Sequence, residues 1–124
     1  MTFWLPSNMN VFEEQLTLKI ESRLADIKRV KAQRLSVQMV LQSSEAHLDL
    51  LLSSWNFLSK KARIVSLNEA KSMKINLLSV QHDINVLNKK ILELNREIVR
   101  LEGEVSILES EKQKVKFKLI EIKK

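Results

Sequence analysis

The chain of 124 residues has almost none of the residues that build turns and loops, with one glycine (Gly103) and one proline (Pro6). Because glycine and proline separate short elements from one another, their scarcity predicts a few long elements. The chain also has no cysteine and no tyrosine. The lack of cysteine excludes disulfides, thiolate metal sites and a cysteine nucleophile, and it is consistent with a reducing compartment.

Long hydrophobic runs are absent as well. The most apolar stretch, Leu48 to Leu58, contains Asp49 and serines and is far shorter than the roughly 20 residues of a membrane span. The first nine residues, MTFWLPSNM, lack the basic and the continuous apolar parts of a secretory signal. The sequence therefore predicts a cytoplasmic protein.

What the sequence does contain is a heptad repeat from Ala70 to Ile122, which is typical of a helix in a coiled coil. Lys112 is its single polar exception. The a positions are Ala70, Leu77, Ile84, Ile91, Ile98, Val105, Lys112 and Leu119, and the d positions are Met73, Val80, Leu87, Leu94, Leu101, Leu108, Val115 and Ile122. A weaker heptad in the first half has a positions Ile20, Ile27, Arg34, Leu41, Leu48, Trp55 and Ala62, and d positions Leu16, Arg23, Val30, Val37, Ser44, Leu51 and Leu58.

The two repeats are out of phase by one residue, and the segment between them, Ser66 to Glu69, fits the capping box S-x-x-E. We therefore predict a short extension over residues 1–10, a helix over about 11–60, a turn over about 61–66 and a second helix over about 67–124. An antiparallel arrangement centred near Ile64 pairs residues whose numbers add to about 128, so that a positions meet d positions. The predicted fold is all-α, a single long antiparallel two-helix coiled-coil hairpin.

An alternative is one continuous helix in a parallel homodimer, with the extra residue absorbed as a local phase shift. The positions of the charged residues favour the hairpin over the parallel dimer. The basic cluster from Lys28 to Arg34 would lie beside the acidic stretch from Glu93 to Glu104 in the hairpin, whereas a parallel dimer would stack each cluster on its own copy.

No catalytic constellation is visible, so we predict a protein that is not an enzyme and binds no cofactor. His47 and His82 would lie side by side, but two histidines are too few for a metal site. Several large apolar residues fall outside both heptads and suggest a partner surface. They are Phe3, Trp4, Leu5, Leu50, Leu52, Phe57, Leu78, Leu92, Val99, Ile107, Phe117 and Ile120.

The net charge of +6 is concentrated in a lysine-rich end, KQKVKFKLIEIKK. With Phe117 as its one aromatic residue, this end lacks the stacking platform of a nucleic-acid site. Its Val115, Leu119 and Ile122 belong to the heptad, which argues against a lipid anchor. The charge instead favours docking into an acidic groove or pore of a protein.

An antiparallel two-helix coiled coil of this size, with both termini at a basic open end, resembles the central stalk proteins of bacterial type III secretion ATPases, the FliJ/YscO/InvI group. The most particular similarity lies in LDLLLSSWNFLSKKARIVSLNEAKS (48–72), where an apolar helix end passes into a polar turn without glycine. The resemblance implies a non-catalytic stalk in protein transport and virulence. Its paired helix ends would enter a hexameric secretion ATPase, assemble or activate it, and couple it to the export gate at the cytoplasmic face of the secretion apparatus.

The same resemblance implies two sets of contact residues. The ATPase pore would meet Lys112, Lys114, Lys116, Phe117, Lys118, Lys123 and Lys124, and the export gate protein would meet Trp55 and Phe57. No nucleic-acid partner is expected, and contact with the inner membrane is expected only through the complex. The alternative function is a homodimeric coiled-coil tether or scaffold without an ATPase partner.

Overall fold

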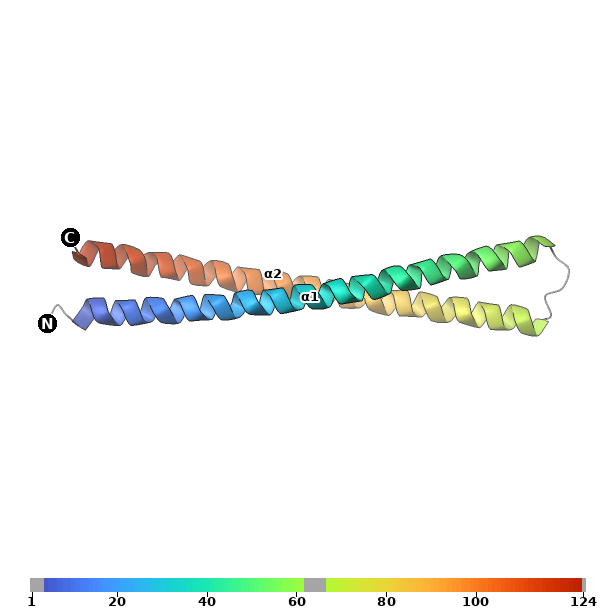
Figure 1. The fold of residues 1–124 in the computed structure, drawn as a ribbon, viewed down its shortest axis with the longest axis horizontal. Helices are drawn as coiled ribbons and strands as arrows, with labels where there is room; N and C mark the ends of the chain where they lie inside the picture. The colour runs from blue at the N-terminus through green and yellow to red at the C-terminus, as the bar shows by residue number, and fades with distance from the viewer. Residues whose placement is uncertain (1–3, 62–66, 124) are drawn as a thin grey trace. The chain divides into compact units, whose positions relative to one another are not determined.

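A computed structural model describes residues 4–61 and 67–123, all of them helical, and the side chains of 11–57, 67–118 and 120. Helix α1 spans Trp4–Lys61 and helix α2 spans Leu67–Lys123 (Figure 1). The all-α hairpin predicted from the two heptads is confirmed.

Helix α1 begins earlier than expected, so residues 4–10 belong to it and do not form an extension. Pro6 lies in the first turn of α1, where its missing N–H costs no hydrogen bond. Ser66 and most of the predicted turn lie outside the described residues.

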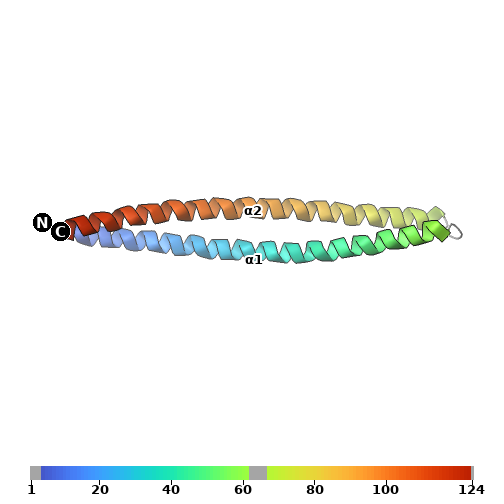
Figure 2. The same ribbon diagram turned by 90° about the horizontal axis from the view of Figure 1, so that it is seen from above.

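The chain forms two compact units, each of which contains a part of both helices. Unit 1 comprises Met1–Ala32 and Asn95–Lys124, and unit 2 comprises Gln33–Leu94. In both units the segments of α1 and α2 run in opposite directions (Figures 1 and 2).

Two contacts fix the register of the helices in unit 1. Arg23 Nε lies 2.8 Å from Glu104 Oε2, and Lys116 Nζ lies 4.0 Å from Glu13 Oε1. The residue numbers of the first pair add to 127 and those of the second pair to 129, so both agree with the predicted sum of about 128. The antiparallel register predicted from the sequence is therefore confirmed in this unit.

The a and d positions of unit 1 form a well-buried seam. Leu16 and Leu101, for example, are each 2% exposed, and Leu16 packs with Val115 and Leu108. The buried residues of unit 1 are Leu16, Ile20, Ile27, Val30, Ile98, Leu101, Val105 and Val115. Burying such side chains contributes about 1.5–3 kcal/mol each, which makes this seam the main source of stability in the unit.

The corresponding seam of unit 2 is shallower. Among its described residues, Val80 and Leu94 are the two that are buried. The other described seam positions are half-buried: Arg34, Val37, Leu41, Ser44, Leu48, Leu51, Trp55, Ala70, Met73, Leu77, Ile84, Leu87 and Ile91. Several flanking e and g positions of unit 2 hold short side chains, such as Ser54, Asn76 and Asn88. They cover less of the seam than the long stems of lysine and glutamate in unit 1.

Candidate functional site: the basic helix ends

The start of α1 and the end of α2 belong to the same unit, and the antiparallel pairing brings them to the same end of it (Figures 1 and 2). We call this surface the basic end and define it by residues 11–18 of α1 and 112–120 of α2. The buried contact of Leu16 with Val115 holds the two helices together here. The basic end is therefore a pair of helix ends on a fixed apolar support.

Three of the predicted contact lysines, Lys114, Lys116 and Lys118, are exposed on α2. Lys112 is half-buried, because it occupies an a position of the seam. Lys123 is the last residue of α2, and its side chain and all of Lys124 lie outside the described residues. The structure thus presents the middle of the lysine run to solvent and holds its first member against α1.

A carboxylate of α1, that of Glu13, lies near one of these lysines. Lys116 Nζ lies 4.0 Å from Glu13 Oε1, a long contact between partly exposed groups of the kind that contributes about 0–1 kcal/mol. A shallow groove of ≈ 240 Å³ runs between Ile20, Lys112 and Lys116. The ion pair of Lys116 with Glu13 is therefore weak enough for a partner to displace.

Apolar side chains are exposed among the lysines. Phe117 is 64% exposed, as predicted from its position outside the heptad. Val11, Phe12 and Leu18 on α1 are exposed as well, by 50%, 49% and 64%. The sequence interpretation missed these three. The first heptad extended back by one repeat places Val11 and Leu18 at f positions, which face away from the partner helix, and Phe12 at a g position on the flank of the seam, and this signal could have found them.

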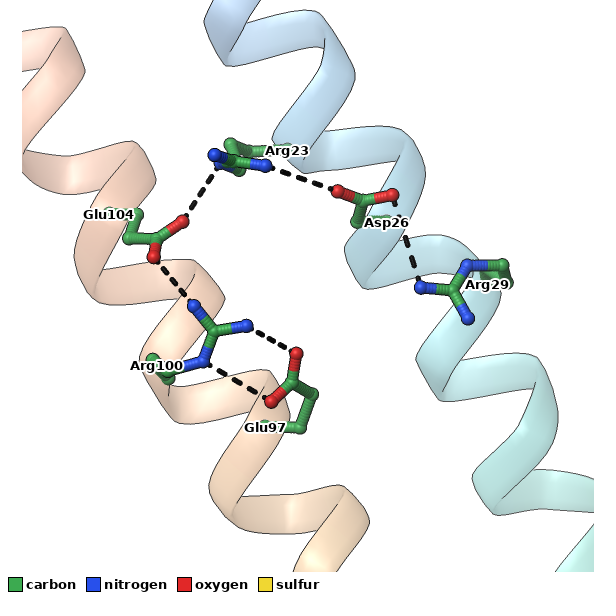
Figure 3. A network of polar contacts seen from close by, with 6 residues as sticks. All are labelled: Arg23, Asp26, Arg29, Glu97, Arg100 and Glu104. Carbon is green, nitrogen blue, oxygen red and sulfur yellow. Dashed lines mark hydrogen bonds and ion pairs between the residues drawn. The ribbon is translucent and has the colours of Figure 1, made fainter.

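A polar network of unit 1 links the helices behind the basic end (Figure 3). Arg23 lies at a d position but is exposed, and its guanidinium contacts Glu104 on α2 and Asp26 on its own helix, at 2.8 Å and 3.5 Å. Asp26 also lies 4.0 Å from Arg29. The Arg23 side chain thus leaves the seam and reaches a glutamate of the second helix.

Arg100 extends this network along α2 (Figure 3). It donates to Glu104 Oε1 at 2.6 Å and to Glu97 Oε2 at 3.2 Å, with a second, shorter contact to Glu97. Hydrogen bonding from Arg100 lowers the pKa of the Glu97 carboxyl below its ordinary value of 4.5, and the same contact raises the pKa of Arg100. Because Glu104 joins Arg100 to Arg23, it connects the charges of the two helices.

The two residues predicted to meet the export gate, Trp55 and Phe57, lie in unit 2. Phe57 is 58% exposed, whereas Trp55 is half-buried at an a position of the seam. His47 and His82 are both exposed. Across the described part of the chain, no three metal-binding side chains gather into a site.

Within the residues that the structure describes, neither helix has a stretch apolar and long enough to span a membrane. The chain matches no family model, no curated protein and no solved structure. Its function therefore has to be argued from its own geometry.

Proposed function

We propose that the chain is the non-catalytic central stalk of a type III secretion system, which inserts its basic end into a hexameric secretion ATPase. Docking there assembles or activates the ATPase and couples it to the export gate, on the cytoplasmic side of the membrane. The single observation that carries this proposal is the basic end itself. Two paired helix ends expose lysines and Phe117 on a buried seam.

The placement of the lysines favours an enclosing partner over a flat one. Lys114 and Lys118 occupy c and g positions, on one flank of α2, whereas Lys116 occupies an e position on the other flank. Phe117, at an f position, lies between the flanks and points away from α1. A flat acidic surface could meet one flank only. A ring of acidic residues around the helix ends would meet both, and the same positive charge would accelerate encounter with it.

The export gate is the second proposed partner, and Phe57 is the side chain offered to it. Its 58% exposure leaves most of the ring accessible. Trp55 contributes less directly in this proposal, because its half-buried ring supports the seam beneath the contact.

The test is stimulation of the secretion ATPase by the purified chain. Replacing Lys114, Lys116 and Lys118 together by Glu is expected to abolish stimulation, because each substitution reverses a charge that faces the acidic pore. The triple variant should keep its helicity, since all three side chains are exposed.

A matched control separates docking from net charge. Lys71, Lys74 and Lys89 are three exposed lysines of α2 that lie in unit 2, and their replacement by Glu changes the net charge equally. This control variant is expected to stimulate like the unaltered chain. Equal loss in both variants would show that only overall charge matters. An unaltered chain that does not stimulate would favour the homodimeric tether or scaffold.

A further inference from the structure

Exposed apolar side chains surround the helix pair at the basic end. Val11 and Phe117 occupy f positions, on the outer sides of α1 and α2, and their numbers add to 128, so they lie at the same level of the register. Phe12 occupies a g position on one flank, and Ile120 occupies a b position on the other flank, one turn nearer the end. We call these four residues the apolar band. They are exposed by 49% to 64%, so each side of the pair carries one exposed apolar side chain.

The apolar band is narrow and lies among the lysines. Its members fall within about four residues of the register, which is roughly 6 Å along the helices at a rise of about 1.5 Å per residue. Lys114, Lys116 and Lys118 are exposed on the same stretch of α2. Positive charge and apolar surface are therefore presented together around one short part of the helix pair.

Further into unit 1 the outer sides of the helices change in character. Leu18 is the last large apolar residue on the outer side of α1 in this unit. The f positions beyond it hold small or charged residues, which are Ala25, Ala32, Arg96, Gly103 and Ser110. The apolar support for a partner that encloses both helices therefore ends near Leu18.

Two groups of exposed apolar residues in unit 2 each leave one outer side without an apolar side chain. Beside the first group, the f position of α2 holds Lys89; the group consists of Leu35, Met39, Val40, Val86 and Leu92. Beside the second group, the f position of α1 holds Ser53; the group consists of Leu50, Leu52, Ile75 and Leu78. Within the described residues, apolar side chains on all four sides at one level are therefore particular to the basic end.

We propose that an apolar collar in the pore of the secretion ATPase closes around the apolar band, beside the acidic residues that meet the lysines. This inference rests on the proposed function and adds a second chemistry to the same contact. The lysines attract the pore over a distance and set the rate of association. The band is buried only once the collar has closed, so it sets the rate of dissociation.

Two other kinds of occupant fit the basic end less well. A second copy of the chain would bring the exposed lysines of both basic ends together, and repulsion between like charges disfavours this contact. A bilayer would take up the apolar band only with Lys114, Lys116 and Lys118 at the same depth, where burial of charged side chains is costly. A protein collar avoids this cost, because it can place carboxylates opposite the lysines and apolar side chains opposite the band.

Binding kinetics of the full chain on the immobilised ATPase hexamer test the inference. Val11→Gln with Phe12→Gln and Phe117→Gln is expected to raise the dissociation rate at least about 10-fold and to change the association rate by less than about threefold. The control, Leu35→Gln with Met39→Gln and Val86→Gln, removes three residues of similar exposure from unit 2 and should bind like the unaltered chain. Circular dichroism verifies that both variants remain helical.

The outcomes separate this inference from the proposed function. A normal dissociation rate of the variant that lacks the band, together with weakened binding of the variant that has Glu in place of Lys114, Lys116 and Lys118, would overturn the apolar collar and leave the proposed function standing. Failure of the unaltered chain to bind the ATPase would overturn both.

Because the chain has no cysteine, single cysteines report which sides the partner covers. Addition of the ATPase should slow thiol labelling at least about 10-fold on all four sides, in Val11→Cys, Phe12→Cys, Phe117→Cys and Ile120→Cys. Ala25→Cys and Ser106→Cys, further into unit 1, should be labelled at an unchanged rate. Protection on one or two sides only would overturn the enclosing collar. Equal protection by vesicles of phosphatidylglycerol would overturn the assignment of the band to a protein.

Discussion

The difference in seam depth between the two units predicts different costs for the same truncation. Leu101 and Leu87 both occupy d positions of α2, two heptads apart. Leu101 belongs to unit 1 and is 2% exposed, whereas Leu87 belongs to unit 2 and is half-buried. Because both changes are Leu→Ala in the interior of one helix, the difference in helix propensity cancels between them. What remains is the difference in burial.

Leu101→Ala is expected to lower the free energy of unfolding by about 3 kcal/mol, since a buried leucine loses its transfer free energy and leaves a cavity. Leu87→Ala should cost about 1–1.5 kcal/mol, because roughly half of the side chain already contacts water and the open site leaves no enclosed cavity. Native domains are stable by about 5–15 kcal/mol, so the larger loss is a substantial fraction of the total.

Urea unfolding followed by circular dichroism at 222 nm measures both losses, at chain concentrations low enough to keep the protein monomeric. Hydrogen exchange adds a local readout, because Leu101→Ala should accelerate exchange mainly in residues 95–118 and their neighbours on α1. Equal losses for the two variants, or a larger loss for Leu87→Ala, would refute the inference that unit 1 holds the stronger seam.

Two further predictions concern the polar network. A double-mutant cycle with Arg23→Met and Glu104→Gln should give a coupling energy of about 0.5–1 kcal/mol that falls with added salt, because both side chains are partly exposed; a coupling that salt leaves unchanged would contradict this. Arg100 lowers the pKa of Glu97, so their contact should stabilise the fold above pH 4.5 and lose its effect as the pH falls through the lowered pKa. Glu97→Gln should remove this part of the acid dependence of unfolding, and an unchanged pH profile would contradict the assignment.

Most of the fold could be predicted from the heptads. Every described a and d position is buried or half-buried except Arg23, and the register in unit 1 agrees with the predicted pairing to within one residue. The start of α1 at Trp4 could not be predicted, because Pro6 is compatible both with an extension and with the first turn of a helix. The difference in burial between the seams of the two units was also not predicted. It depends on how far the flanking side chains extend over the apolar residues, which the pattern of a and d positions does not contain.

At the candidate site, the heptad predicted both the lysine run and which of its described members lies on the seam. Lys112 follows the same alternating pattern as Lys114, yet its a position turns it toward α1. The apolar residues of α1 at the basic end, Phe12 and Leu18 among them, were missed for a different reason. Both lie inside the predicted helix, but outside the a and d positions, so their exposure follows from the heptad once it is extended back to residue 11.

Charged residues are distributed unevenly along α1. Nine of the 22 residues from 11 to 32 are charged, whereas two of the 23 from 35 to 57 are, Glu45 and Asp49. The proposed docking relies on the exposed Lys114, Lys116 and Lys118, so it should weaken with added salt. The buried apolar seam of unit 1 should change little with salt, because apolar packing is not screened by ions. Raising the salt concentration should therefore weaken stimulation of the ATPase while the helicity of the chain, followed by circular dichroism, stays nearly unchanged; a parallel loss of helicity would contradict docking through charge.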